Sequence, residues 1–485
     1  MTLSLKNPAL LREAALVGSR WIDADGAGIA VTNPATGDVI GHVPDLGADE
    51  TQEAISAAEV AQKDWAKKTA KQRADVLRCW FDLMMANQED LAQILTAEQG
   101  KPLAEARGEI GYGASFLEWF AEEARRAYGD VTPTNTPDKR IVCIKQPVGV
   151  TAAITPWNFP NAMITRKAAP AFAAGCAMVL KPSELTPFSA IAMGVLAEEA
   201  GLPAGLFSIV TGDAATIGGV MTASPVVRKI TFTGSTRVGA MLYEQSAKTI
   251  KKLGLELGGN APFIVFDDAD LDAAVDGAIL SKFRNNGQTC VCANRIYVQA
   301  GVYEAFAEKL AEKVSGLKVG NGAEDGTVFG PLINDAAVKK VSGHIQDATS
   351  KGAQVVLGGN AHEMGGTFYQ PTILTGVTSD MAVATEETFG PVAPLFKFTE
   401  EAEAIEAANA TEFGLASYFY SRDIARAWRV SEALDYGMVG VNTGHVSTTE
   451  APFGGVKSSG LGREGGRQGL DDFMETKYIC MGGID

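Results

Sequence analysis

From about residue 141 onward, short runs of β-branched and apolar residues alternate with stretches of helical pattern. Such alternation is typical of parallel βαβ units, in which helices cover both faces of a parallel sheet. The predicted strands span residues 149–155, 177–181, 207–211 and 229–232, and the helices between them residues 165–174, 187–200, 214–222 and 236–247. A second block begins with a strand at 262–266, a helix at 271–283 and a strand at 295–299, and continues to about residue 455. The sequence therefore predicts two α/β domains.

The remaining segments surround these two blocks. Before residue 125, apolar residues recur at helical spacing over residues 54–66, 71–87 and 88–98, and we expect these helices to pack on the first sheet. Residues 141–145 and 475–480 are apolar, strand-like stretches that fit neither domain. Because an unpaired strand edge invites association, we expect them to pair with each other or with another subunit. An ordinary edge strand within one subunit fits the sequence equally well.

Composition limits the classes of function. The chain has 485 residues with 42 basic and 58 acidic side chains, and its net charge of −16 disfavours nucleic acid and membrane partners. Six scattered cysteines indicate reduced thiols, and the N-terminus shows no secretory signal, so we expect a cytoplasmic protein. The four histidines show no spacing typical of a metal site, and no metal is expected. With so few histidines, a carboxylate is the expected catalytic base.

Residues 286–290 supply a candidate nucleophile. Small and polar residues flank Cys290, which favours a thiol at a cleft with a lowered pKa. Glu256, within residues 255–259, is the candidate base. Asn158, in a proline-flanked loop, can donate its amide to an oxyanion together with the backbone N–H of Cys290. A buried structural cysteine and a turn-forming asparagine are the alternatives.

Two further segments indicate a dinucleotide. Residues 229–239 have the pattern strand, glycine turn, helix, which places backbone N–H groups at a helix N-terminus where a pyrophosphate can sit, although most such turns bind nothing. Lys181 and Glu184 follow a predicted strand and can reach a ribose. The Glu184 carboxylate accepts hydrogen bonds from ribose hydroxyls and repels a 2′-phosphate, which favours NAD over NADP. A helix-capping role for Glu184 is the alternative.

Seven ordered motifs connect these candidates, at residues 156–160, 181–184, 232–236, 255–259, 287–290, 386–391 and 452–455. In order and spacing they resemble the aldehyde dehydrogenase superfamily over nearly the whole chain. The resemblance implies an α/β fold class with two doubly wound parallel-sheet domains, one cofactor-binding and one catalytic, plus a small β oligomerisation element. It assigns residues 1–127 and 147–255 to the NAD-binding domain, 256–458 to the catalytic domain, and 128–146 and 459–485 to oligomerisation segments.

The resemblance also implies a role for each candidate. Cys290 attacks an aldehyde, Asn158 holds the resulting oxyanion, and Glu256 activates the water that hydrolyses a thioester. Because superfamily members that transfer the acyl group to coenzyme A generally lack this base, Glu256 favours release of a free acid. The cofactor is expected to be NAD, with NADP possible. Its implied contacts are Ile154, Trp157, Lys181, Glu184, Gly234, Ser235, Gly258, Glu387 and Phe389.

The residues around the nucleophile narrow the substrate. Residues 162–167, 282–285, 290–295 and 441–444 resemble succinate-semialdehyde dehydrogenases. Arg166, Arg284 and the Ser447 hydroxyl are then expected to bind a distal carboxylate by charge-assisted hydrogen bonds. His445, Thr448 and Thr449 lie where relatives vary, so glutarate semialdehyde is the rival substrate, and a broader aldehyde specificity or a surface role for Arg284 also remains open.

Three other expectations complete the analysis. Cys292 lies two residues from Cys290, so oxidation is predicted to join the two in a strained disulfide that inactivates the enzyme reversibly. The superfamily resemblance implies a homotetramer built as a dimer of dimers. A binding protein that has kept an enzyme's fold is the alternative of a different class, but every catalytic position here is filled.

Overall fold

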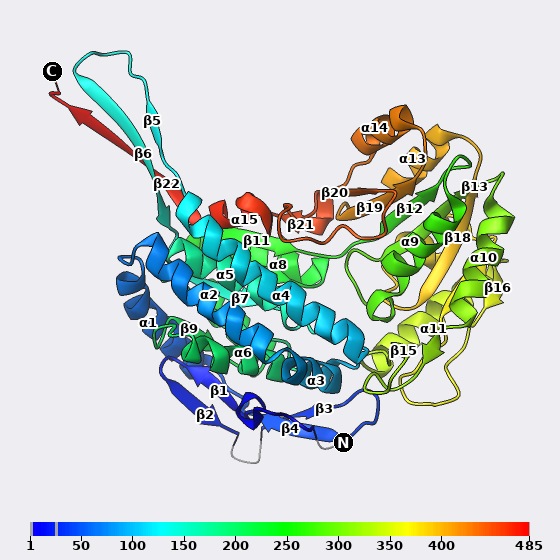
Figure 1. Cartoon of the computed structure of the whole chain (residues 1–485), viewed down its shortest axis with the longest axis horizontal. Helices are drawn as coiled ribbons and strands as arrows, with labels where there is room; N and C mark the ends of the chain where they lie inside the picture. The colour runs from blue at the N-terminus through cyan, green and yellow to red at the C-terminus, as the bar shows by residue number, and fades with distance from the viewer. Residues whose placement is uncertain (1–2, 25–27, 485) are drawn as a thin grey trace.

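The computed structural model describes residues 3–24 and 28–484, in which two α/β domains each surround a central sheet (Figure 1). The first sheet has the strand order β2-β1-β9-β8-β7-β10-β11-β21. Its strands are β1 Ala14–Val17, β2 Arg20–Asp23, β7 Val150–Ile154, β8 Ala177–Lys181, β9 Phe207–Ile209, β10 Val227–Thr233, β11 Lys252–Glu256 and β21 Gly460–Leu461. Strands β9, β8, β7, β10 and β11 run parallel. Their buried positions fit a sheet covered on both faces.

The parallel strands confirm the prediction, and the N-terminal strands correct it. The predicted strand 177–181 coincides with β8, and the others agree within about two residues. Before residue 125, however, the chain also forms β1, β2 and the hairpin of β3 Ile29–Thr32 with β4 Val39–Val43. The sequence analysis missed them because they are only four or five residues long. The fully buried β1 also lacks the alternation of apolar and polar residues that marks a strand.

Helices cover both faces of the first sheet. They are α1 Ala48–Trp65, α2 Ala70–Ala86, α3 Gln88–Gln99, α4 Leu103–Glu123, α5 Ala162–Ala174, α6 Pro187–Glu199, α7 Ala214–Ala223 and α8 Thr236–Ser246. The sequence analysis delimited no helix at α4, since Gly108, Gly111 and Gly113 lower its helix propensity. Gly113 allows α4 to approach α5 closely, because a Cβ there would lie 2.2 Å from Asn161 Oδ1. Every residue of α5 is buried.

The second domain repeats the plan around a sheet with the order β16-β17-β18-β13-β12-β19-β20. Its strands are β12 Ala261–Val265, β13 Ala293–Gln299, β16 Gln354–Leu357, β17 Thr372–Thr375, β18 Val392–Phe398, β19 Ala416–Tyr420 and β20 Met438–Val441. Its helices are α9 Leu271–Phe283, α10 Tyr303–Ser315, α11 Asp335–Ser350, α12 Ala382–Thr385, α13 Glu401–Asn409 and α14 Ile424–Ala433. Strands β14 Lys318–Val319 and β15 Thr327–Phe329 form a separate pair. The predicted helix 271–283 coincides with α9.

A three-stranded sheet in the order β22-β6-β5 projects from the first domain (Figure 1). Strand β6 Lys139–Pro147 pairs antiparallel with β22 Met474–Gly482 along its whole length and with β5 Asp130–Thr132 at one edge. The two stretches predicted to pair with each other therefore do so within the chain. The segment 459–485 is not wholly part of this element, because β21 joins the first sheet and α15 Gly466–Asp471 packs against α5.

Among the described helices, none combines the length and the apolar character that crossing a membrane requires.

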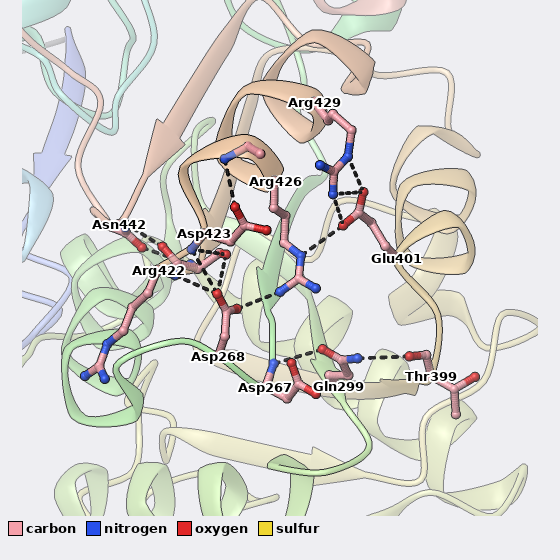
Figure 2. Close-up of polar contacts among 12 residues, drawn as sticks. Asp267, Asp268, Gln299, Thr399, Glu401, Arg422, Asp423, Arg426, Arg429 and Asn442 are labelled. Carbon is pink, nitrogen blue, oxygen red and sulfur yellow. Dashed lines mark hydrogen bonds and ion pairs between the residues drawn. The ribbon is translucent and has the colours of Figure 1, made fainter.

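The Asp268 carboxylate fastens the start of α14 to the loop after β12 (Figure 2). One oxygen accepts hydrogen bonds from the Ser421 hydroxyl at 2.8 Å and from the backbone N–H groups of Arg422 and Asp423 at 2.9 and 3.0 Å. The other pairs with Arg426 at 2.7 Å, which also contacts Glu401 on α13 at 2.9 Å. Burial favours a higher pKa for Asp268, but these donors outweigh it and lower the pKa below its ordinary value.

We expect Asp268→Asn to lower the free energy of unfolding by about 1–2 kcal/mol at neutral pH, since hydrogen bonds to a charged acceptor are lost at a partly exposed site. Because the folded pKa is depressed, the contribution is present above the unfolded pKa and disappears as pH falls through the folded one. Denaturant midpoints for parent and variant should therefore converge below about pH 4. Asp267→Asn is the matched control, since Asp267 contacts Gln299 through its backbone N–H. An equal loss in both variants would contradict the assignment.

Candidate active site

A cavity of about 670 Å³ lies between the two domains, with walls from both. In the first sheet, β7 leads to β8 on one side and β10 leads to β11 on the other, so the chain connections diverge between β7 and β10. The carboxyl ends of β7 and β10 lead into the loops that carry Asn158 and Gly234. Ligands of doubly wound sheets bind at such a switch point. Of the predicted site residues, those that line the cavity are Trp157, Asn158, Arg166, Gly234, Ser235, Gly258, Arg284, Cys290, Glu387, Phe389 and Ser447.

A tight turn positions the candidate nucleophile. Asn285 and Asn286 adopt left-handed conformations with φ of 49° and 58°, which asparagine tolerates better than most residues. Gly287 follows with φ 75°, and a Cβ there would lie 2.2 Å from the Gly390 carbonyl oxygen. Cys290 emerges from this turn half-buried on the cavity wall. The residue order Asn-Asn-Gly therefore fixes where the thiol lies.

The thiol does not have the lowered pKa that the sequence analysis expected. Burial raises the pKa of Cys290 to about 12, which the positive charge of Arg166 opposes and the carboxylate of Glu256 reinforces. Flanking residue types could not reveal this, because the effect comes from the enclosure of the sulfur between two domains. The thiol is therefore protonated at neutral pH in this structure.

Asn158 lies beside the nucleophile turn and is 5% exposed. Its Nδ2 donates to the backbone carbonyl of Gln288 at 3.0 Å, two residues before Cys290. Since an amide nitrogen carries two N–H donors, one remains for a ligand in the cavity. The structure thus places Asn158 against the turn that carries Cys290, and its oxyanion role stays a prediction.

Glu256 ends β11 and lies behind the cavity wall, where it is 3% exposed. Its Oε1 is near Gly454, at which a Cβ would lie 2.9 Å away, and its Oε2 has no hydrogen-bond partner among the described residues. Burial raises the pKa of Glu256 well above its ordinary value, and the neighbouring Glu464 carboxylate adds to the rise. The carboxylate is thus a stronger base than an ordinary glutamate.

Several residues in the cavity fit a dinucleotide. Ser235 caps the N-terminus of α8, which places helix N–H groups at the wall. Trp157 and Phe389 meet edge to face at 5.6 Å, and Phe389 has a φ of 56°. Glu387 accepts a hydrogen bond from the Gly259 N–H at 3.1 Å, and burial raises its pKa to about 7. A half-buried carboxylate with one such donor can still accept a hydrogen bond from a ribose hydroxyl.

Other predicted cofactor residues lie away from the cavity wall. Lys181 ends β8 and is buried, and its Nζ pairs with the exposed carboxylate of Glu184 at 2.8 Å. Ile154 ends the neighbouring strand β7 and is half-buried. All three lie at the carboxyl edge of the first sheet, the edge from which the cavity opens. Their cofactor contacts stay predictions.

The two arginines predicted to bind an anion have different partners. Arg166 is 2% exposed, and its guanidinium forms an ion pair with Glu464 at 2.9 Å and lies 3.9 Å over the Phe453 ring. In the described structure its Nε donates no hydrogen bond. Arg284 instead contacts a neutral partner, His445 Nδ1, at 3.2 Å, and burial with the nearby guanidinium lowers the pKa of His445. Ser447 lines the same wall.

The sequence analysis missed several wall residues. Glu105 and Tyr112 come from α4, and Lys340 from α11 donates to the backbone carbonyl of Glu387 at 2.5 Å. The Glu105 carboxylate accepts from the backbone N–H of Asn285 at 2.8 Å. No local pattern marks these residues, because each reaches the cavity from a helix far from the motifs in sequence. Within residues 3–24 and 28–484, no cluster of three potential metal ligands occurs.

Cys292 faces away from the cavity. It is 1% exposed, and its sulfur contacts the Lys282 carbonyl oxygen at 3.2 Å and Lys282 Nζ at 3.3 Å. Both Cys290 and Cys292 are free thiols in the structure. The predicted disulfide between them therefore requires the Cys292 side chain to leave Lys282.

We expect dilute hydrogen peroxide to oxidise Cys290 and to join it to Cys292, with two water molecules released. Peptide mass spectrometry should find the disulfide in the parent, and dithiothreitol should restore both thiols. In Cys292→Ala the Cys290 sulfenic acid has no neighbouring thiol and should proceed to the sulfinic acid, which dithiothreitol does not reduce. Equal recovery of the Cys290 thiol in parent and variant would exclude the disulfide. Cys79→Ala, which changes an exposed thiol elsewhere, is the control.

Comparison with known proteins identifies the family. The model described as the aldehyde dehydrogenase family matches residues 21–479. The chain is 63% identical to a 3-sulfolactaldehyde dehydrogenase of Pseudomonas putida over 484 residues, which cover 100% of each protein. It is 62% identical both to a glutarate-semialdehyde dehydrogenase of Pseudomonas aeruginosa and to an NADP(+)-dependent succinate-semialdehyde dehydrogenase of Escherichia coli, with 99% of this chain and 100% of each relative covered.

A solved structure agrees with the fold. The crystal structure of a succinate-semialdehyde dehydrogenase from Burkholderia pseudomallei has a TM-score of 0.98 and 62% sequence identity, and the match covers 99% of this chain and 100% of that one. The arrangement of two parallel-sheet domains with a projecting antiparallel sheet is therefore that of a known class of enzymes. This chain belongs to the aldehyde dehydrogenase family.

Proposed function

We propose that this chain oxidises succinate semialdehyde to succinate with NAD or NADP, through a thioester on Cys290 that water then hydrolyses. The observation that carries the proposal is that one cavity presents the Cys290 thiol, the Asn158 amide and two guanidinium groups, those of Arg166 and Arg284. An aldehyde with a carboxylate at its far end matches this combination of nucleophile, oxyanion donor and cation.

The reaction begins at the thiol, because the thiolate is the nucleophile. The cation of Arg166 opposes the burial that raises the pKa of Cys290, so it favours loss of the thiol proton to solvent in the cavity. Attack on the aldehyde carbon forms a carbon–sulfur bond and an oxyanion, to which the second N–H of Asn158 and the backbone N–H of Cys290 donate. When bound, the nicotinamide supplies the hydride acceptor that converts this adduct to a thioester.

Hydrolysis requires a base, and Glu256 supplies it. Its raised pKa makes the ionised carboxylate a strong acceptor for a water proton. The hydroxide adds to the thioester carbon, the carbon–sulfur bond breaks, and the free acid leaves with the Cys290 thiolate restored. Since Glu256 lies behind the cavity wall, it acts through a water molecule or after a side-chain rotation.

The substrate carboxylate binds at Arg284, Arg166 and Ser447. Arg284 is the stronger candidate, because its closest described partner is the neutral ring of His445 rather than a carboxylate. Relatives at 62–63% identity are named as dehydrogenases of succinate semialdehyde, glutarate semialdehyde and 3-sulfolactaldehyde, and each of these aldehydes has an anionic end. Glutarate semialdehyde is therefore the alternative substrate. A single methylene changes pocket discrimination by only about 1–3 kcal/mol.

Cofactor choice and assembly complete the proposal. Glu184 favours NAD, as the sequence analysis expected, and NADP use is the alternative that the Escherichia coli relative's name supports. The β22-β6-β5 sheet leaves apolar side chains exposed, such as Val131 at 78% and Tyr478 at 60%, which supports association of copies into the proposed homotetramer. The cytoplasmic location stays a prediction.

We expect Arg284→Ala to lower kcat/KM for succinate semialdehyde by about 10- to 100-fold, mainly through KM, since a charge-assisted contact to the carboxylate is lost. Initial rates of NADH formation measure this effect. An uncharged aldehyde of similar length is the control substrate, and its kcat/KM should change little. If the parent oxidises glutarate semialdehyde faster, the alternative substrate takes precedence. If Arg284→Ala leaves kcat/KM unchanged for both succinate semialdehyde and glutarate semialdehyde, the anion site is assigned wrongly.

We expect kcat to fall as pH is lowered through the raised pKa of Glu256. The sign follows from the structure, since a carboxyl that keeps its proton to higher pH is inactive as a base over a wider acid range. Glu256→Gln should lower kcat by about 100-fold or more and remove this acid limb. Glu464→Gln, which removes the repelling charge, should move the limb to lower pH. An unchanged profile in Glu256→Gln would show that another group is the base.

A further inference from the structure

A buried ion pair joins Lys101, in the turn between α3 and α4, to Glu109, an α4 residue that is part of the cavity wall. Lys101 Nζ contacts Glu109 Oε2 at 2.5 Å, and the side chains are 0% and 1% exposed. The Lys101 ammonium also lies 3.8 Å over the Phe159 ring. Lys101 does not line the cavity, and neither the reaction nor the proposed cofactor contacts use this pair.

Each member of the pair reaches the oxyanion loop. Lys101 Nζ donates to the backbone carbonyl of Asn158 at 2.8 Å. The other carboxylate oxygen of Glu109 accepts from the backbone N–H groups of Asn161 and Ala162 at 2.9 and 3.2 Å, where α5 begins. The pair therefore holds both ends of the short segment from Asn158 to the first turn of α5.

The same carbonyl of Asn158 receives a donor from the second domain. Asn285 Nδ2 donates to it at 3.0 Å, while Asn158 Nδ2 donates to the Gln288 carbonyl, also at 3.0 Å. These reciprocal bonds join the oxyanion loop to the turn that carries Cys290. Lys101 thus supplies one of the donors that fix where the Asn158 side chain begins.

The turn bearing Lys101 is itself held by the second domain. A Cβ at Gly330 would lie 2.2 Å from the Gly100 carbonyl oxygen, and one at Gly322 would lie 2.5 Å from the Lys101 carbonyl oxygen. The Leu103 N–H donates to the Gly322 carbonyl at 2.9 Å. Because these backbones touch, the position of Lys101 is set by the docking of the two domains.

Stability alone is a weak reason for such a pair. Removing two charges from water costs about as much as their attraction returns, so apolar residues of similar volume often serve as well. Here the charges point at particular backbone groups, one carbonyl and two N–H groups, all within the loop of Asn158. That arrangement is the one expected of a pair that fixes the position of the Asn158 loop.

We propose that Lys101 and Glu109 are positioning residues that set the Asn158 amide at the distance from Cys290 that oxyanion binding requires. The proposal rests on the oxyanion role of Asn158 put forward above. Lys101 lies outside the cavity lining, so its effect should appear in kcat and pass through Asn158.

The test compares Lys101→Met with Asn158→Ala and the double variant of the two. Asn158→Ala should lower kcat by about 100- to 1000-fold, as loss of one oxyanion donor does elsewhere. Lys101→Met alone should lower kcat by about 10-fold or more at saturating cofactor, with the KM for the cofactor unchanged. In the Asn158→Ala background, Lys101→Met should have no further effect, because the amide that it positions is absent.

Two controls separate position from folding. The double variant of Lys101→Met and Glu109→Gln removes both charges and leaves no unpaired buried ion. It replaces Lys101→Met if that single variant folds poorly, and it should show the same fall in kcat. Arg73→Met breaks a buried donor to Ala173 at the opposite end of α5, originally at 2.9 Å, and should lower the melting temperature but not kcat.

Each outcome decides between the two proposals. Falls in kcat that multiply in the double variant would assign Lys101 a general structural role and overturn the positioning proposal. An unchanged kcat in Lys101→Met beside a large fall in Asn158→Ala would overturn it too, while leaving the proposed function intact. An unchanged kcat in Asn158→Ala would remove the oxyanion role itself, and the positioning role with it.

Discussion

The active site depends on the backbone carbonyls of Asn158 and Gln288, which join the two domains beside the nucleophile. The first accepts hydrogen bonds from Lys101 and Asn285, and the second from Asn158. Asn158, the proposed oxyanion donor, follows a strand of one sheet, and Cys290 precedes a strand of the other. Neither domain alone can therefore set their separation, and the docking of the domains is part of the catalytic geometry.

Burial of charge is the second constraint. Glu464 lies between Arg166 at 2.9 Å and Lys167 at 2.5 Å, and its charge raises the pKa of the nearby Glu256. Within this group, cations and carboxylates nearly balance. Arg284 stands apart, because its described contacts are the neutral His445 and the face of Phe159 at 5.2 Å. Glu105 on the same wall interacts with Arg284 through space, but among the described residues no carboxylate contacts the guanidinium directly. A cation without a direct carboxylate partner on a cavity wall favours an anionic ligand. We therefore expect Arg284, more than Arg166, to determine which substrate charge the cavity accepts.

The sequence predicted features that are set by neighbouring residues, and it missed those that depend on burial in the folded chain. The alternating pattern predicted β8 and α9 to the residue, and the apolar stretches that fitted neither domain do pair with each other. Strand β1 was missed because four buried residues carry no alternation. The raised pKa of Cys290 was missed because its cause is burial by residues from both domains. The proposed role of Lys101 could not be predicted either, since its contacts cross from the turn between α3 and α4 to the loop of Asn158.

The pairing of Lys181 with Glu184 modifies the argument for NAD. The Glu184 side chain is 51% exposed, but its carboxylate contacts the buried Lys181 ammonium at 2.8 Å. Burial favours a higher pKa for Glu184, and Lys181 lowers it on balance, so the carboxylate is ionised at neutral pH. A paired carboxylate repels a 2′-phosphate less than a lone one, because the ammonium cancels much of its field. If Lys181 turned to a 2′-phosphate, the same two residues would accommodate NADP. We therefore expect cofactor selectivity to depend on the Lys181–Glu184 pair rather than on Glu184 alone.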